Sequence, residues 1–236
     1  MDYYRGKDIG DPEKLTDSCL RVIESGSAER IYTILPHISI LRSERFLEPL
    51  AGLLQSGDYS QQSAAAMALS CLSDARAVEP LRRALDGMRK RDPKDSAGVQ
   101  ASVIAAMGET GCENAVAPLV AVLEELKGSG SSSHLIAAAL KALGDLAGQG
   151  CVEALQELTR LLDSKDEDIR VQAINECTVA FWNRPAEISD TLLQRLFSLA
   201  RQGSPRVRRT VQAGLHNLGE LGSQRARTYL ERLVNE

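Results

Sequence analysis

A short apolar pattern returns along the whole chain, and its spacing restricts the fold more than any other feature of the sequence. Six leucines stand at the same place in this pattern, and the residues three and four positions after each are mostly apolar, which is the spacing of one helix face. They are separated by 31, 38, 36, 38 and 37 residues: Leu50, Leu81, Leu119, Leu155, Leu193 and Leu230. Recurrence at this interval predicts a tandem repeat of small helical units.

A second apolar series lies twelve residues before each of these leucines: Ile38, Leu69, Met107, Leu143, Phe181 and Leu218. Each unit is therefore expected to hold one helix, here called helix A, then a short turn and a second helix, helix B. The residue after the helix A marker is small in five of the six copies, which we expect to let helix A end in a tight turn. Aromatic residues make up 4% of the chain, which favours helices over strands.

Two segments identify the type of repeat. Residues 143–155 (LGDLAGQGCVEAL) and residues 166–173 (DEDIRVQA) resemble HEAT-like repeats of the short kind found in phycobilin lyases, and residues 204–209 (SPRVRR) are similar to the second of them. The resemblance covers about residues 27–236. It implies an all-α, right-handed α-solenoid of about six antiparallel two-helix HEAT-like repeats with an N-terminal capping helix. Because many unrelated activities use this repeat, it implies little about function.

The register of the repeats predicts the domain boundaries. A flexible tail is expected over residues 1–12, followed by a single repeat domain over residues 13–236. Within this domain we expect a cap helix at 13–26 and repeats at 27–57, 58–95, 96–132, 133–165, 166–203 and 204–236.

The sequence carries no recognisable catalytic, metal or cofactor motif. Its three histidines, His37, His134 and His216, lack an adjacent glutamate of the kind that holds iron in HEAT-like hydroxylases, and the five cysteines include no CxxC pair. We therefore predict no catalytic residues, no metal ligands and no cofactor. Cysteine usage, together with the absence of an apolar run that could cross a bilayer, favours a cytoplasmic protein without membrane attachment.

Charge is unevenly distributed along a chain whose net charge is −4. Basic residues gather at 82–94 and 201–232, whereas residues 109–168 hold eleven acidic and four basic side chains. The acidic middle would repel phosphate, so nucleic-acid binding is the less favoured interpretation. The basic clusters are consistent with either a binding patch for a partner or a solvated surface.

The residues between the core positions of successive B helices are expected to form a ladder on the concave face of the solenoid. Trp182 departs from the repeat, because it replaces the small residue after helix A and is followed by Arg184 in the turn; Trp and Arg often dominate binding interfaces. The candidate partner-binding residues are Arg82, Arg83, Val120, Ala121, Gln156, Glu157, Trp182, Arg184, Gln194, Arg195, Glu231 and Arg232. We expect a non-catalytic scaffold that binds a protein or peptide, with a bilin lyase-like or chromophore-handling protein as the alternative. The oligomeric state is left open.

Overall fold

The computed structural model describes residues 11–91, 96–129 and 133–234, and its backbone packs into two compact units, residues 1–106 and 107–236. The tail predicted for residues 1–12 lies outside the described residues as far as residue 10. The single domain predicted over residues 13–236 stays a prediction.

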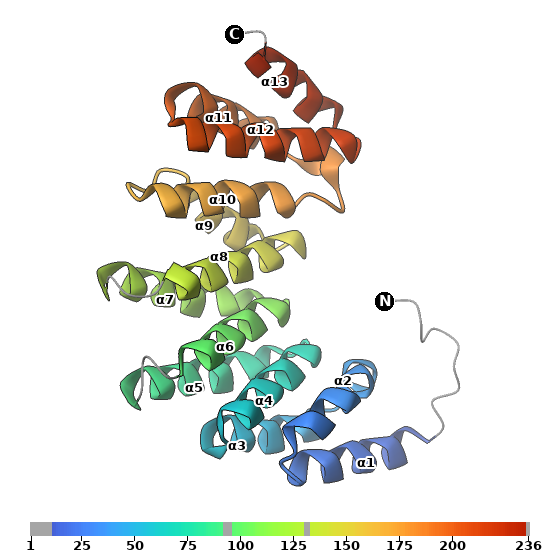
Figure 1. Ribbon diagram of the computed structural model, residues 1–236. Helices are drawn as coiled ribbons and strands as arrows, with labels where there is room; N and C mark the ends of the chain where they lie inside the picture. The colour runs from blue at the N-terminus through green and yellow to red at the C-terminus, as the bar shows by residue number, and fades with distance from the viewer. Residues whose placement is uncertain (1–10, 92–95, 130–132, 235–236) are drawn as a thin grey trace. The chain divides into compact units, whose positions relative to one another are not determined.

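The described residues form thirteen α-helices, four short 3-10 helices and no β-strand (Figure 1). The helices are α1 Pro12–Glu24, α2 Ala28–Leu41, α3 Leu47–Ser56, α4 Tyr59–Cys71, α5 Val78–Arg91, α6 Ala97–Glu109, α7 Val116–Ser129, α8 Ser133–Gly148, α9 Val152–Leu161, α10 Glu167–Val179, α11 Asp190–Gln202, α12 Pro205–Glu220 and α13 Gln224–Val234. The predicted all-α class is confirmed, and the alternation of A and B helices after α1 is that of an α-solenoid.

Helix starts follow local sequence signals. Asp58 caps α4 in a capping box with Gln61, and Asp166 caps α10. Helices α3, α5 and α7 begin two residues before Pro49, Pro80 and Pro118, because proline is tolerated in the first turn, where its missing N–H has no intrahelical partner.

In the first unit, α2 and α4 are the A helices and α3 and α5 are the B helices. Helix α4 packs against both α2 and α3, α3 also packs against α5, and α1 covers α2 and α3 at the start of the unit. The fully buried residues Ile38, Leu50, Leu69 and Leu81, all expected as core positions, lie inside this unit.

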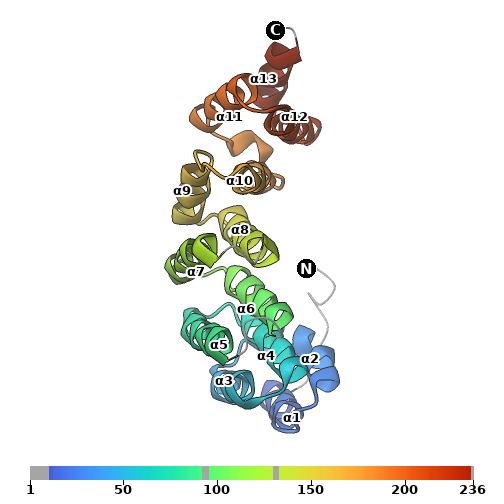
Figure 2. The same ribbon diagram turned by 60° about the vertical axis from the view of Figure 1, so that its left-hand side comes forward.

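In the second unit the A and B helices form two layers. Helices α8, α10 and α12 lie in one layer, and α7, α9 and α11 lie in the other (Figure 2). Helix α10 packs against α8, α12 and α9, while α8 also packs against α7 and α12 also packs against α11 and α13. The helix A markers Met107, Leu143, Phe181 and Leu218 are all buried between the layers, as the repeat predicted.

Two of the six anchor leucines are less buried than predicted: Leu155 in α9, and Leu230 in α13 at the end of the described residues. Leu155, expected in the core as the anchor of α9, is half-exposed, and the fully buried positions of this helix include Ala154 and Leu158. The buried face of α9 is thus shifted by one residue relative to α3, α5 and α7, in which the leucine three residues after the start is fully buried. This shift leaves an apolar side chain on the outer surface of the B-helix layer.

Two glycines after the helix A markers allow close packing, and at Gly144 the expected tight-turn role is wrong because α8 continues to Gly148. A Cβ atom on Gly108 would lie 2.6 Å from the Cα atom of Ala142 in α8, and one on Gly144 would lie 2.5 Å from Oε2 of Glu176 in α10. The turns themselves use Gly111 and Gly150, whose φ values of 69° and 101° are in the left-handed region. The small position therefore lets neighbouring A helices approach closely.

Glu176 is a buried carboxyl group between α8 and α10. Its Oε1 accepts a hydrogen bond of 2.6 Å from the Gln172 amide, while Lys141 and Asp145 of α8, which form an ion pair with each other, are its charged neighbours. Burial raises the pKa of Glu176 above its usual value, and the charge of Asp145 adds to this, against the opposing effects of Gln172 and Lys141. The folded protein thus binds a proton at this position more tightly than the unfolded chain.

We expect Glu176→Gln to stabilise the protein at neutral pH. Because the folded pKa is raised, the wild type loses stability as the pH rises from the unfolded pKa to the folded pKa, and the loss persists at higher pH. The neutral amide avoids that loss, so the gain should be greatest at pH 7 and vanish near pH 4. Urea unfolding at several pH values measures it; a gain that is the same at every pH would contradict burial of the charge as its cause.

Candidate functional site

The outer surface of the B-helix layer in the second unit contains two neighbouring grooves. In the A-helix layer, neighbouring helices pack closely against one another. In the B-helix layer, neighbouring helices make fewer contacts. The space between α7 and α9, here the α7–α9 groove, is a cavity of about 790 Å³. The space between α9 and α11, here the α9–α11 groove, is a cavity of about 960 Å³. Helix α9 is the wall that the two grooves share.

The α7–α9 groove combines apolar side chains with carboxylates. Val116, Ala117, Val120 and Ala121 of α7 supply the apolar part of its wall. The polar and charged lining residues are Glu113, Asn114, Glu153 and Glu157. The groove thus carries negative charge beside an apolar surface.

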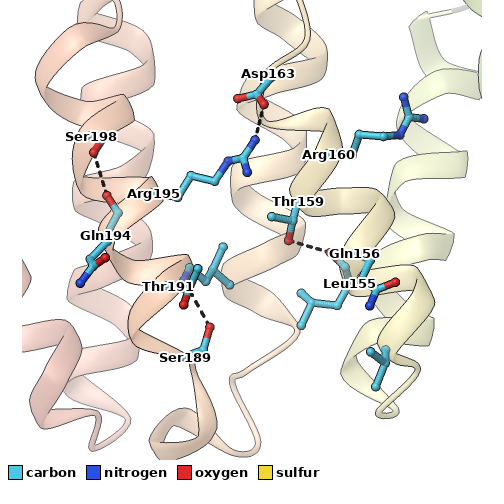
Figure 3. Close-up of a pocket in the computed structure, with 12 residues that line it drawn as sticks. Leu155, Gln156, Thr159, Arg160, Asp163, Ser189, Thr191, Gln194, Arg195 and Ser198 are labelled. Atoms are coloured by element: carbon cyan, nitrogen blue, oxygen red, sulfur yellow. Dashed lines mark hydrogen bonds and ion pairs between the residues drawn. The ribbon is translucent and has the colours of Figure 1, made fainter.

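The α9–α11 groove is more nearly neutral. Its lining residues are Val152, Leu155, Gln156, Thr159, Arg160, Asp163, Ser189, Thr191, Leu192, Gln194, Arg195 and Ser198. Arg195 of α11 reaches across to Asp163 after α9 and forms an ion pair that closes one end (Figure 3). Leu155, turned outward by the register of α9, provides apolar surface between the polar groups.

Several hydroxyl groups in the α9–α11 groove bond to the protein backbone. Thr159 donates to the Leu155 carbonyl at 2.7 Å, Ser198 donates to the Gln194 carbonyl at 3.0 Å, and Ser189 accepts from the Leu192 N–H at 3.2 Å. The side-chain amides of Gln156 and Gln194, which are exposed on α9 and α11, have no hydrogen-bond partner within the part of the chain that the structure describes. Each offers one acceptor and two donors to a ligand.

Six of the twelve candidate residues line these grooves. Val120, Ala121 and Glu157 line the α7–α9 groove, and Gln156, Gln194 and Arg195 line the α9–α11 groove. The other six lie elsewhere: Arg82 and Arg83 on α5, Trp182 and Arg184 in the turn after α10, and Glu231 and Arg232 on α13.

The arginines outside the grooves are held by the chain itself. Arg82 and Arg83 both bond to Glu79, at 2.9 and 2.7 Å, and these hydrogen bonds lower the pKa of Glu79 to about 2. Arg184 donates to the Ala147 carbonyl at 2.7 Å, while Trp182 beside it is 45% exposed. These arginines therefore neutralise a carboxylate or donate to a backbone carbonyl within their own unit.

The basic cluster at 201–232 shows the same internal pairing. Arg206 pairs with Asp168 and Arg225 with Asp190, while Arg208 and Arg227 donate to backbone carbonyls. Arg232 lies over the rings of Phe197 and Tyr229, at 5.2 and 5.5 Å. In the cluster at 82–94, residues 92–95 lie outside the described residues.

Sequence reasoning missed some of the groove residues. Glu113 and Glu153 stand at the start of their helical segments, where the expected ladder did not extend. Leu155 was assigned to the core because the repeat was aligned by leucines. The sequence did contain one indication of the charged groove residues, because the acidic excess over residues 109–168 includes the glutamates of the α7–α9 groove.

The five cysteines are free thiols. Burial raises the pKa of Cys177 to about 12, which suppresses its reactivity as a thiolate. Within residues 11–91, 96–129 and 133–234, no three His, Cys, Asp or Glu side chains are grouped so as to hold a metal ion. None of the described helices is both long and apolar enough to span a bilayer.

A family model for the PBS lyase HEAT-like repeat matches residues 99–125, which cover most of α6 and the first part of α7. The chain thus contains a HEAT-like repeat over these residues. The matched segment is the helix pair that precedes α8, and it includes part of the wall of the α7–α9 groove.

Two solved structures are similar to most of the chain at low sequence identity. An engineered protein shares 20% identity with a TM-score of 0.37 and covers 92% of this chain and 94% of its own. An archaeal HEAT-like repeats protein from Thermococcus onnurineus NA1 shares 14% identity with a TM-score of 0.39, over 92% of this chain and 85% of its own. No curated protein matches the chain.

Proposed function

We propose that this protein is a non-catalytic scaffold that binds an extended protein segment along the α7–α9 and α9–α11 grooves. The observation that carries the proposal is the pair of adjacent cavities of about 790 and 960 Å³ on either side of α9. Both are lined by α9, so a peptide that crosses this helix can occupy the two in sequence. Repeat proteins offer extended surfaces of this kind to their partners.

The chemistry of the groove walls suits a polypeptide ligand. Apolar surface from Leu155 and Val152 supplies burial energy, while Gln156 and Gln194 supply amides that match the N–H and C=O groups of a peptide backbone. Amides form hydrogen bonds without acting as acids, bases or nucleophiles, which supports binding as the role of this surface.

Replacing both free amides should weaken partner binding without changing stability. We expect Gln156→Ala/Gln194→Ala to reduce retention of the native partner about tenfold, because each lost hydrogen bond contributes about 0.5–1.5 kcal/mol. The immobilised protein would be exposed to native cell extract, and the retained proteins would be quantified by mass spectrometry.

The matched control is Gln55→Ala/Gln202→Ala. Gln55 and Gln202 are exposed glutamines near the ends of the B helices α3 and α11, and neither lines a groove. This variant should retain partners like the wild type, and both variants should keep the wild-type melting temperature. Retention that is the same for the two double variants would contradict the proposal.

A further inference from the structure

The α7–α9 groove differs from its neighbour in the sign of its charge. All charged residues that line it are glutamates, Glu113, Glu153 and Glu157, whereas the α9–α11 groove contains Arg160 and Arg195 as well as Asp163. A ligand that spans both grooves therefore meets a negative region at one end, and the chemistry of this region decides which part of the ligand it accepts.

Two of the three carboxylates are available to a ligand. Arg160 donates to Glu157 at 2.8 Å and neutralises it. Glu113 and Glu153 form no ion pair within the described residues; Glu153 accepts a weak contact of 3.6 Å from the Cys151 thiol. The charges of both glutamates add to burial in raising the pKa of this thiol, and both side chains line the groove.

The apolar surface lies directly beside these charges. Val120 is half-buried, and Ala117 and Ala121 are exposed on α7. A lysine or arginine side chain has the same two parts, an apolar stem and a cationic head. An anionic segment would be repelled, and a purely apolar one would leave two carboxylates partly desolvated without a partner.

We infer that the α7–α9 groove binds a basic side chain of the partner segment, with its stem on Val120 and its head between Glu113 and Glu153. The partner recognised by this protein is thus a peptide segment that carries lysine or arginine beside small apolar residues. The inference rests on the proposed function and adds the charge of the ligand and its place in the groove.

The test compares two peptides that differ only in one charged group. Fluorescein-labelled Ala-Leu-Ala-Lys-Ala-Leu and its norleucine analogue share the same stem, and the norleucine analogue lacks the ammonium group. Fluorescence anisotropy with the full chain should give about fivefold to tenfold tighter binding of the lysine peptide, and this preference should shrink with added salt. An arginine version should bind at least as well as the lysine peptide because its head can bond to two carboxylates.

The variant Glu113→Gln/Glu153→Gln should abolish the preference for lysine over norleucine. The control Glu29→Gln/Glu48→Gln removes the same charge from the first turns of α2 and α3, so the helix dipoles are affected alike. It should keep the full preference. Circular dichroism checks that both double variants are folded.

Three results would overturn the inference: no binding of the lysine peptide up to about 1 mM, equal binding of the two peptides to the wild type, or an equal loss of preference in both double variants. The last would mean that the overall negative charge attracts the peptide. Retention of the native partner that still depends on Gln156 and Gln194 would show that the proposed function stands even when this inference fails.

Discussion

Replacing Leu158 by alanine is expected to lower the free energy of unfolding by about 2–5 kcal/mol, whereas Leu155→Ala should cost at most about 1 kcal/mol. Leu158 is fully buried in α9, so its truncation leaves a cavity between the helix layers. Leu155 is half-exposed in the wall of the α9–α11 groove, so solvent fills the space that it leaves.

Urea unfolding followed by far-UV circular dichroism distinguishes these two variants. They remove the same atoms from the same helix, so helix propensity and unfolded-state effects are matched. Leu155→Ala should additionally weaken partner binding, because it removes apolar surface from the groove. Equal losses of stability would mean that both leucines belong to the core and that the outward register of α9 is wrong.

Gly108→Ala is expected to destabilise the protein by about 1–3 kcal/mol, although alanine is the better helix former. The added methyl group would lie 2.6 and 2.7 Å from the Cα and carbonyl oxygen of Ala142. These are backbone atoms, which cannot rotate away as a side chain can, so α6 and α8 must separate along their contact. The close packing on both sides of that contact would be lost with it.

The control for this prediction is Gly52→Ala in α3. A Cβ atom at Gly52 would have no other atom within 4 Å. The substitution should therefore stabilise the protein by about 0.5–1 kcal/mol through helix propensity alone. Thermal or urea unfolding of both variants gives the comparison; a gain of stability in Gly108→Ala would show that α6 and α8 do not pack as closely as described.

The sequence predicted the helix pairs because burial and helical spacing are properties of each repeat by itself. Met107, Leu143 and Leu218 are buried where the twelve-residue offset placed them. The register of α9 was not predicted, because Ala154 and Leu155 are both apolar and the leucine pattern alone favours Leu155 as the core residue.

The candidate site was harder to predict because a groove belongs to two helices at once. Gln156 and Gln194 were named from their places between core leucines, and both line the α9–α11 groove. Arg82 was named from the same ladder and Arg184 from the turn beside Trp182, and the structure uses their charge in contacts to Glu79 and to the Ala147 carbonyl. Such pairing depends on which side chains the turns bring within reach, which a linear pattern does not record.

The unequal spacing of the two helix layers has a mechanical consequence for the second unit. Gly108 lies against the Ala142 backbone and Gly144 against the Glu176 side chain, so neighbouring A helices are close together, whereas the B helices are separated by the two grooves. Bending is therefore easiest about a hinge line that runs through the A helices, because rotation there hardly changes their contacts. Small rotations of this kind would widen or narrow the grooves while the interior stays packed, so the proposed site could accommodate segments of different thickness.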